Sequence, residues 1–378
     1  MEIRTSEFTC KRGELNIRGT RFDPENATGA AIICHGFMGI RQPLETYARA
    51  LAGAGYATFT FDFCGGGIGS ESDGDTREMT VFTEREDLIA VMDYVRRQTG
   101  REKLVLMGCS QGGAVCALTA AVVPEQVEKL VLFYPALCIP DDARRGQMLM
   151  ARFDPENIPE YFSCGPMELG RCYAASVIHE DFFPVIRKYR GPVHIVHGDM
   201  DRAVNISYSY KAKEAYGDNC SFTVLKNADH GFQGIQDEAA IYDTLQFLQG
   251  RTAILTVDVR LTGFVEEKNG EDSVVTLPFD GSVDGLFTGT ILPGAADVQQ
   301  WHLGKPVEMC ATYTMKGRDY TGRECTVKVV NRGNSEGQWT PAVTTDSMAL
   351  EVLNRGGCTA FLEHRQTGPV VRIYAEKP

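Results

Sequence analysis

Ser110 lies in a pattern that is typical of an activated serine nucleophile. It is the centre of Gly108-Cys109-Ser110-Gln111-Gly112, directly after the apolar run KLVLM and before the small-residue run GAVCAL. In a strand–turn–helix context, G-x-S-x-G marks a turn so tight that only glycine fits beside the serine. The serine oxygen then projects at a helix N-terminus, whose dipole favours developing negative charge. We therefore interpret Ser110 as the nucleophile of an acyl-transfer reaction.

A serine hydroxyl needs a general base, and the base needs an acid that orients it. The expected chain order is serine, acid, histidine. His230 follows the strand-like run SFTVLKNAD, and Asp201 follows PVHIVHGDM, so strand ends bring both to the edge of the sheet that carries Ser110. We expect His230 to be the general base and Asp201 the orienting acid. Asp199 is the alternative acid, although its place directly after a strand also suits a turn or capping carboxylate.

The loop ICHGFMG, residues 33–39, also follows a strand-like run directly. A loop in this place supplies one backbone N–H of an oxyanion hole, and the residue after the nucleophile supplies the other. We assign these donors to Phe37 and Gln111. His194 and His197 lie within one strand and are interpreted as core or sheet-face histidines rather than a metal pair. This chemistry needs no metal and no organic cofactor.

The elements that position these residues alternate between strand and helix up to about Gln249. This order predicts an α/β fold with a mostly parallel sheet and an antiparallel hairpin at its first edge. Continuous apolar runs predict strands that are covered on both faces. The expected strands are SEFTCKR, LNIRGTRF, GAAIICHG, ATFTFDF, KLVLMGCS, KLVLFYPA, PVHIVHGD and SFTVLKNA.

Two segments depart from this alternation. Residues 136–190 contain no clean strand, and an insertion of this length favours a functional lid over a passive loop. From about Ala253, alternating strand runs with regular turn residues predict a small antiparallel β-domain, a barrel or a sandwich. ALEVLNRG, residues 349–356, is among these expected strands. We therefore expect a catalytic domain over residues 1–250 and a barrel-like domain over residues 251–378.

Composition limits the class of protein. The 378 residues carry a net charge of −12, which disfavours binding to nucleic acid or to an anionic membrane surface. The N-terminus has no apolar segment of the signal-peptide kind, and no apolar run is long enough to span a bilayer. The twelve cysteines include no CxxC pair and are expected to be reduced, mostly buried thiols. A cytoplasmic location is the expectation.

Several motifs together resemble the bacterial feruloyl (cinnamoyl) esterases of the α/β-hydrolase superfamily. The motifs are HGFMG, FDFCGGGIGSES, GCSQGG, HGDMDRAV and ADHGF. Within the insertion, ALCIPDDARRG, FDPENIPEYF and LGRCYAAS resemble that family's lid, and the resemblance covers roughly residues 5–249. It implies an α/β-hydrolase fold in which Ser110, Asp201 and His230 form a catalytic triad.

The same resemblance implies that Phe37 and Gln111 are the oxyanion donors. It also implies that Asp142 and Tyr173 contact the ring hydroxyl of a phenolic substrate. The alternative is that Asp142 caps a helix and Tyr173 packs inside the lid. The chain departs from the family at the turn CGGG and in the lid run GQMLMARFDP, where methionine and leucine replace polar residues. A more apolar lid favours plainer acyl groups.

The C-terminal stretch resembles a bacterial family of small β-barrel domains without an established function. LPGAADVQQ, ATYTMKGRDYTG and TVKVVNRGN carry this resemblance. We find no catalytic constellation there, and association into a homo-oligomer through this domain is a possible role.

The leading hypothesis is hydrolysis of hydroxycinnamate-type esters through an acyl-serine. The first alternative is a broader carboxylesterase, an acyltransferase or a peptidase with the same triad, since one fold hosts many chemistries. The second is a hydrolase-like scaffold without activity. That hypothesis predicts the loss of a triad residue, whereas all three are present in order.

Overall fold

The computed structural model describes residues 2–334, 338–365 and 368–376. Its contacts divide the chain into two compact units, Met1–Gln233 and Gly234–Pro378. Each unit has its own cluster of buried apolar side chains. The domain boundary expected near residue 250 stays a prediction.

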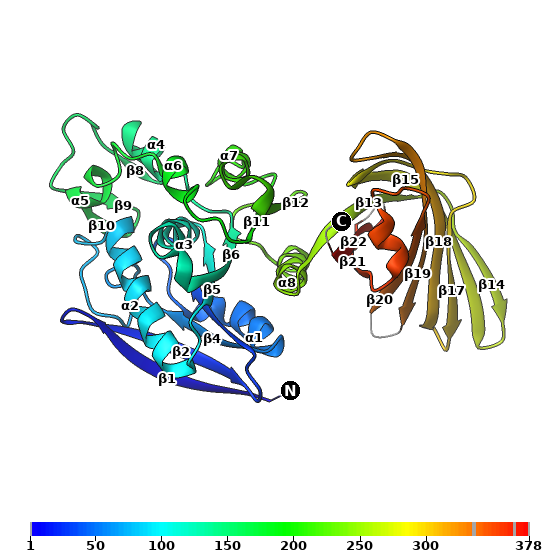
Figure 1. Cartoon of the computed structure of the whole chain (residues 1–378), viewed down its shortest axis with the longest axis horizontal. Helices are drawn as coiled ribbons and strands as arrows, with labels where there is room; N and C mark the ends of the chain where they lie inside the picture. Colours follow the sequence, from blue (N-terminus) through cyan, green and yellow to red (C-terminus); the bar gives the residue numbers. More distant parts are fainter. Residues whose placement is uncertain (1, 335–337, 366–367, 377–378) are drawn as a thin grey trace. The chain divides into compact units, whose positions relative to one another are not determined.

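The first unit is built on an eight-stranded sheet in the order β1-β2-β4-β3-β5-β6-β11-β12 (Figure 1). β1 and β2 form an antiparallel hairpin, β2 pairs antiparallel with β4, and the remaining neighbours are parallel. All eight expected strands are therefore present. They are β1 (Ile3–Arg12), β2 (Leu15–Pro24), β3 (Gly29–Cys34), β4 (Tyr56–Phe61), β5 (Leu104–Cys109), β6 (Val127–Phe133), β11 (Val193–Gly198) and β12 (Cys220–Leu225).

Burial explains why these runs form central strands. Every residue of β3, β5 and β11 is buried, as expected for parallel strands that are covered on both faces. The covering helices include α2 and α3, which pack against each other. The helices that pack on the sheet are α1 (Glu45–Gly53), α2 (Val81–Thr99), α3 (Gln111–Val122) and α7 (Ser207–Tyr216), with short 3-10 turns at η1 (Gln42–Leu44), η2 (Pro124–Gln126) and η3 (Gly217–Asn219).

The inserted segment between β6 and β11 folds as short helices and two small hairpins. The four-residue strands β9 and β10 pair antiparallel, so the segment contains more strand than the sequence indicates. Its elements are α4 (Ile139–Arg144), β7 (Gln147–Met148), β8 (Ala151–Arg152), β9 (Tyr161–Cys164), β10 (Met167–Gly170), α5 (Arg171–Ala175) and α6 (Phe182–Ile186).

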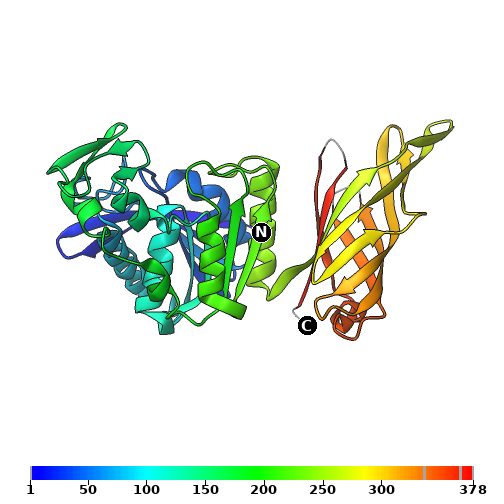
Figure 2. The same cartoon turned by 90° about the horizontal axis from the view of Figure 1, so that it is seen from above.

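The second unit begins with α8 (Ile235–Leu248) and continues as an antiparallel barrel (Figure 2). The barrel closes because β13 pairs with both β15 and β22. Its ring order is β13-β22-β21-β20-β19-β18-β16-β15. In addition, β14 pairs with β15, and β17 pairs with both β15 and β18. The bounds are β13 (Arg251–Leu261), β14 (Val265–Asn269), β15 (Asp272–Gly285), β16 (Phe287–Ile291), β17 (Ala296–His302), β18 (Lys305–Asp319), β19 (Glu324–Asn334), β20 (Trp339–Thr345), η4 (Glu351–Arg355), β21 (Thr359–Glu363) and β22 (Val370–Glu376).

The prediction of a strand at residues 349–356 is wrong, because Glu351–Arg355 forms the 3-10 helix η4. Leu350 and Leu353 are both buried, and a spacing of three residues places them on one face of a helical turn. The side chain of Asn354 also accepts from Thr345 N–H and donates to Thr345 C=O, which holds the turn in place.

The twelve cysteines all lie within the described residues and form no disulfide, and ten of them are buried. Within the described ranges, no helix is both long and apolar enough to cross a membrane.

Candidate active site

Ser110 joins the end of β5 to the start of α3 with a backbone φ of +54°. This left-handed conformation is unfavourable for any residue with a side chain, and strain of this kind gathers at functional sites. The flanking glycines make the turn possible. A Cβ on Gly112 would lie 2.3 Å from the carbonyl oxygen of His35, and one on Gly108 would lie 2.3 Å from that of Gly112.

His230 connects Ser110 to Asp201 in a continuous chain of hydrogen bonds. Its Nε2 lies 3.0 Å from Ser110 Oγ, and its Nδ1 lies 2.8 Å from Asp201 Oδ2. With the carboxylate accepting from Nδ1–H, Nε2 is left to accept the serine proton. The three side chains come from turns after β5, β11 and β12, so the strand ends place them together.

The carboxylate of Asp201 is fully buried and receives several hydrogen bonds. Its Oδ1 accepts from the backbone N–H groups of Ala203 and Val204 at 2.9 and 2.8 Å. Burial alone would raise the pKa of Asp201, but hydrogen bonds from His197, His230 and the Val204 backbone hold that pKa well below its usual value. The acid is therefore held as a carboxylate.

The structure places Asp201 beside His230, whereas Asp199 contacts other residues. Asp199 Oδ1 accepts from the backbone N–H of Asn227 at 2.6 Å, and Oδ2 lies 3.5 Å from Lys226 Nζ. This carboxylate links the turns that follow β11 and β12.

His197 contacts the acid directly, which the sequence interpretation missed. Its Nε2 lies 3.1 Å from Asp201 Oδ2 and 3.0 Å from the carbonyl of Val204, and its Nδ1 lies 2.7 Å from Ser209 Oγ. The ring is completely buried. The spacing of four residues between His197 and Asp201 was the only signal, and alone it does not distinguish this contact from core packing. His194 lies 2.8 Å from Ser221 Oγ instead.

Gln111 and Tyr173 belong to a buried polar chain that ends at Glu84. The hydroxyl of Tyr173 donates to Gln111 Oε1 at 2.6 Å, and Gln111 Nε2 donates to Glu84 Oε2 at 2.8 Å. Burial raises the pKa of Glu84 well above its usual value, even though its hydrogen bond with Gln111 acts in the opposite direction. The chain fixes the side chain next to the nucleophile and ties the lid to α2. Phe37 packs on the ring of Tyr173, with centroids 5.5 Å apart.

The loop that carries Phe37 is anchored by His35. His35 Nε2 accepts from the backbone N–H of Phe63 at 3.1 Å, and Nδ1 lies 2.8 Å from the carbonyl of Gly36. Burial lowers the pKa of His35, against the hydrogen bond to Gly36. A neutral ring that donates from Nδ1 and accepts at Nε2 satisfies both contacts.

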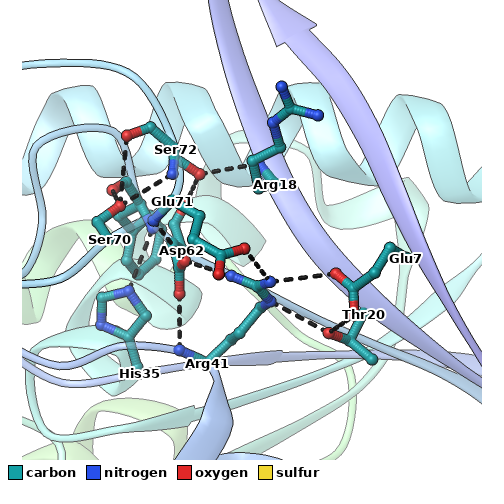
Figure 3. A network of polar contacts seen from close by, with 10 residues as sticks. Glu7, Arg18, Thr20, His35, Arg41, Asp62, Ser70, Glu71 and Ser72 are labelled. Carbon is teal, nitrogen blue, oxygen red and sulfur yellow. Dashed lines mark hydrogen bonds and ion pairs between the residues drawn. The ribbon is translucent and has the colours of Figure 1, made fainter.

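Arg41 anchors the other end of this loop. Figure 3 shows its guanidinium surrounded by three carboxylates, those of Glu7, Asp62 and Glu71. Arg41 is 4% exposed and lies 2.5 Å from Asp62, 2.6 Å from Glu71 and 3.1 Å from Glu7. Its backbone N–H also donates to Asp62 Oδ1 at 2.7 Å. The loop with Phe37 is thus tied to the end of β4.

The candidate site opens into a cavity of about 160 Å³. Most of its wall is apolar, and polar groups gather near the nucleophile, as in many small-molecule sites. Its lining is Phe37, Ser110, Gln111, Ala136, Cys138, Ile139, Asp142, Met148, Leu149, Cys164, Tyr173, Ala203, Val204 and His230.

The lid residues Asp142 and Tyr173 both reach this cavity. Asp142 pairs with Arg145, and burial raises the pKa of its carboxyl against the hydrogen bonds that lower it. The proton of the Tyr173 hydroxyl points to Gln111, so its oxygen can accept from a ligand. Met148 and Leu149, from the apolar lid run, lie in the same wall.

A wider, open depression of about 880 Å³ shares His230 and Asp142 with the cavity. Its other lining residues include Arg145, Arg202 and Asp229. The two spaces meet at the histidine. The cavity is small and mostly apolar, whereas the depression is wide and lined by polar and apolar groups in about equal measure.

Parts of the chain are similar to known proteins. Residues 25–163 match the family described as serine aminopeptidase, S33. A 31.7 kDa Escherichia coli protein, described as uncharacterized and in the traX–finO intergenic region, is 37% identical over 103 residues. That match covers 26% of this chain and 35% of the relative, so the chain spans about a third of the length of this curated relative.

Solved structures resemble the first unit over nearly their whole length. The structure described as ferulic acid bound to Est1E from Butyrivibrio proteoclasticus is 27% identical, with a TM-score of 0.59. The match covers 64% of this chain and 97% of Est1E. The α/β hydrolase GrgF from Penicillium sp. sh18 is 17% identical with a TM-score of 0.54, covers 66% of this chain and 98% of GrgF, and shows the fold alone. The first unit therefore has the α/β-hydrolase fold, as the sequence predicts.

Proposed function

We propose that the protein is a serine carboxylic-ester hydrolase that cleaves hydroxycinnamate-type esters. The observation that carries the proposal is the chain from Ser110 through His230 to Asp201, with contacts of 3.0 and 2.8 Å beside an apolar cavity. The likeness to a structure of Est1E with ferulic acid bound supports the choice of acyl group.

In the first step, Ser110 Oγ attacks the ester carbonyl while His230 Nε2 takes the serine proton. Asp201 stabilises the imidazolium that forms, because its carboxylate accepts from Nδ1–H. Backbone N–H groups of Phe37 and Gln111 donate to the carbonyl oxygen as it gains charge. The C–O bond then breaks, and the alcohol leaves with the proton from His230.

In the second step, His230 removes a proton from water, and the resulting hydroxide attacks the acyl-serine carbonyl. Collapse of this intermediate returns the proton to Ser110 and releases the acid. The apolar cavity holds the acyl chain, and the wider depression beside His230 receives the alcohol.

Asp142 and Tyr173 supply specificity for a ring hydroxyl. The carboxyl of Asp142 lies in the cavity wall, and the oxygen of Tyr173 can accept because its proton is held by Gln111. A phenolic hydroxyl that reaches Asp142 or Tyr173 exchanges its hydrogen bonds with water for a hydrogen bond with the protein.

The lid also supports a second candidate, a carboxylesterase that prefers plain acyl groups. Asp142 already pairs with Arg145, while Met148 and Leu149 add apolar surface to the same wall. This arrangement favours an acyl chain without a hydroxyl. An acyltransferase or peptidase would use the same triad. The cytoplasmic location remains a prediction.

Hydrolysis of methyl ferulate, methyl cinnamate and p-nitrophenyl butyrate distinguishes these functions. The hydroxycinnamate proposal expects kcat/KM for methyl ferulate to exceed that for methyl cinnamate by about 10–100-fold, the value of one charge-assisted hydrogen bond. Ser110→Ala should abolish hydrolysis of all three esters. A wild-type protein that cleaves none of them would overturn the esterase proposal.

Asp142→Asn, compared with Asp141→Asn, tests the lid. We expect Asp142→Asn to remove most of the preference for methyl ferulate. Asp141 accepts from Tyr208 at 2.7 Å and does not line the cavity, so Asp141→Asn should retain the preference. Equal cleavage of ferulate and cinnamate esters by the wild type would favour the plain-acyl carboxylesterase.

A further inference from the structure

The barrel of the second unit contains its own cavity, of about 210 Å³. Eight-stranded barrels are just wide enough for their interior to be filled by side chains or to hold one small ligand. Most of this wall is apolar. The apolar lining residues are Val259, Leu261, Leu277, Phe279, Met309, Ala311, Trp339, Leu362, Pro369 and Val371.

Four buried polar atoms of the lining residues have no hydrogen-bond partner among the described residues: the Tyr313 hydroxyl, Asn331 Oδ1, Asp297 Oδ1 and Arg365 Nη2. The first two are neutral. Tyr313 is 3% exposed and Asn331 is 1% exposed, and both line the cavity. Among the described residues, neither the Tyr313 hydroxyl nor Asn331 Oδ1 has a hydrogen-bond partner. A buried polar atom without a partner costs about 1–3 kcal/mol, so such atoms are uncommon unless they serve a ligand or ordered water.

Strand register places these groups around one small side chain. Ala311 on β18 lies opposite Asp297 on β17 and opposite Asn331 on β19. Tyr313 is two residues further along β18, hence on the same face and roughly 7 Å away. Because alanine ends at a methyl group, space remains between the polar groups.

Aromatic side chains form part of the cavity wall. The ring of Phe279 packs edge-on against Tyr313, with centroids 5.5 Å apart. Trp339 lies over Gly333, where a Cβ would come within 2.9 Å of the indole. Glycine at this position therefore lets the indole lie flat against the barrel wall.

The charges around the cavity favour a neutral ligand. Arg365 lines the cavity, but its Nε donates to Glu363 at 3.0 Å and its Nη1 lies 3.9 Å from Asp258. Glu363 and Asp258 thus offset its positive charge, while Glu363 also pairs with Arg372 at 2.8 Å. Asp297 is half-buried and accepts from Gln299 Nε2 at 2.6 Å, and burial raises the pKa of its carboxyl.

We propose that the barrel cavity binds a neutral aromatic alcohol or phenol. The ring lies among the apolar side chains, and the hydroxyl donates to Asn331 Oδ1 and accepts from the Tyr313 hydroxyl. This site is separate from the candidate active site, since all of its lining residues lie in the second unit. The proposal does not depend on the hydrolase function.

Titration of the full chain with 2-naphthol tests the proposal, and naphthalene is the control that lacks the hydroxyl. Both tryptophans of the chain, Trp301 and Trp339, are in the barrel, so their fluorescence reports binding there. We expect saturable quenching by 2-naphthol and at least about tenfold weaker binding of naphthalene, the equivalent of 1.4 kcal/mol. Equal affinity for the two probes would overturn recognition of the hydroxyl.

Variants locate the bound probe. Tyr313→Phe and Asn331→Leu should each weaken 2-naphthol binding about tenfold. Neither should lower the thermal midpoint, because each removes a polar atom that has no partner in the described protein. Tyr320→Phe makes the same change at a side chain that is 56% exposed and should alter nothing.

Ala311→Met fills the cavity and should abolish quenching by both probes. Quenching that survives this substitution would show that the probe binds elsewhere and would overturn the proposal. A cavity that holds only water would give no saturable quenching by either probe. In that case Tyr313→Phe would also lower the thermal midpoint, because a bridging water would lose its partner.

Discussion

The carboxylate of Asp201 determines which nitrogen of His230 carries a proton. An amide in its place can donate from Nδ2, which favours the tautomer with the proton on Nε2 and leaves no acceptor for Ser110. We expect Asp201→Asn to lower kcat by about 10⁴-fold with little change in KM. Steady-state kinetics with p-nitrophenyl butyrate measure this. Asp199→Asn, at the alternative acid, is the control and should stay within about threefold, because Asp199 contacts Asn227 and Lys226 rather than His230.

Glu84 is a carboxyl with a raised pKa, caused first by its burial and increased by the nearby charge of Asp87. Because the folded-state pKa exceeds the unfolded value, the group's contribution to stability is fully present below the unfolded pKa. It is lost as the pH rises through the folded pKa. Glutamine cannot ionise, so Glu84→Gln should escape this loss.

Thermal unfolding of wild type and Glu84→Gln should therefore diverge as the pH rises. We expect close midpoints near pH 5 and a higher midpoint for the variant near pH 8. The difference should be roughly 2–4 °C for each kcal/mol of unfolding free energy that ionisation of Glu84 costs the wild type. Glu102→Gln, at an exposed position, should follow the wild type throughout. A variant that unfolds at a lower temperature near pH 8 would contradict the expected cost of the ionised carboxyl.

At the scale of elements, Arg41 joins the loop after β3 to β1 and to the end of β4. Asp62 is fully buried, so loss of the guanidinium leaves an uncompensated charge. We expect Arg41→Met to destabilise the first unit by about 3–5 kcal/mol. Urea unfolding, followed by helical circular dichroism, measures this. Adding Asp62→Asn should recover part of the loss.

Arg49→Met is the matched control for this substitution. Arg49 pairs with Glu45, but the two side chains are 47% and 51% exposed. An exposed ion pair contributes at most about 1 kcal/mol, so this change should be small. Similar losses at Arg41 and Arg49 would show that the buried network does not hold the loop.

The elements that could be predicted are those specified by neighbouring residues. The turn at Ser110 was predictable because a strand, two glycines and a helix lie within one short run. Asp201 and His230 followed from their places after strands. The contact of Tyr173 with Gln111 joins residues 62 apart, and that of Arg41 with Asp62 joins residues 21 apart, so no local pattern reports them.

The errors have the same origin. Residues 349–356 have the apolar content of a strand, but contacts between Asn354 and Thr345 favour a helical turn. Closure of the barrel depends on β13 pairing with both β15 and β22, and β13 and β22 are the first and last described strands of this unit. The sequence alone left barrel and sandwich as alternatives because alternation does not specify partners.

At the scale of the whole molecule, two separate cores predict two unfolding transitions. Leu106 and Leu255 are both completely buried, the first in the core of the first unit and the second in the barrel. Replacing a buried leucine by alanine costs about 2–5 kcal/mol. We expect Leu255→Ala to lower the midpoint seen by tryptophan fluorescence and to leave ester hydrolysis unchanged.

Leu106→Ala should do the opposite. It should lower the midpoint seen by helical circular dichroism and leave the tryptophan transition unchanged. If both variants shift both signals equally, the chain unfolds as one cooperative unit. Association of copies through the barrel remains a prediction, which light scattering of the full chain would test.

Ser110 holds a φ of +54°, which costs a serine about 1–3 kcal/mol and a glycine almost nothing. Replacement by alanine keeps this strain, whereas replacement by glycine removes it, and both remove the nucleophile. In a lineage in which catalysis is no longer under selection, the stability of the fold therefore favours glycine over alanine at position 110. A descendant with glycine would lack catalytic activity but would have a more stable fold than a descendant with alanine.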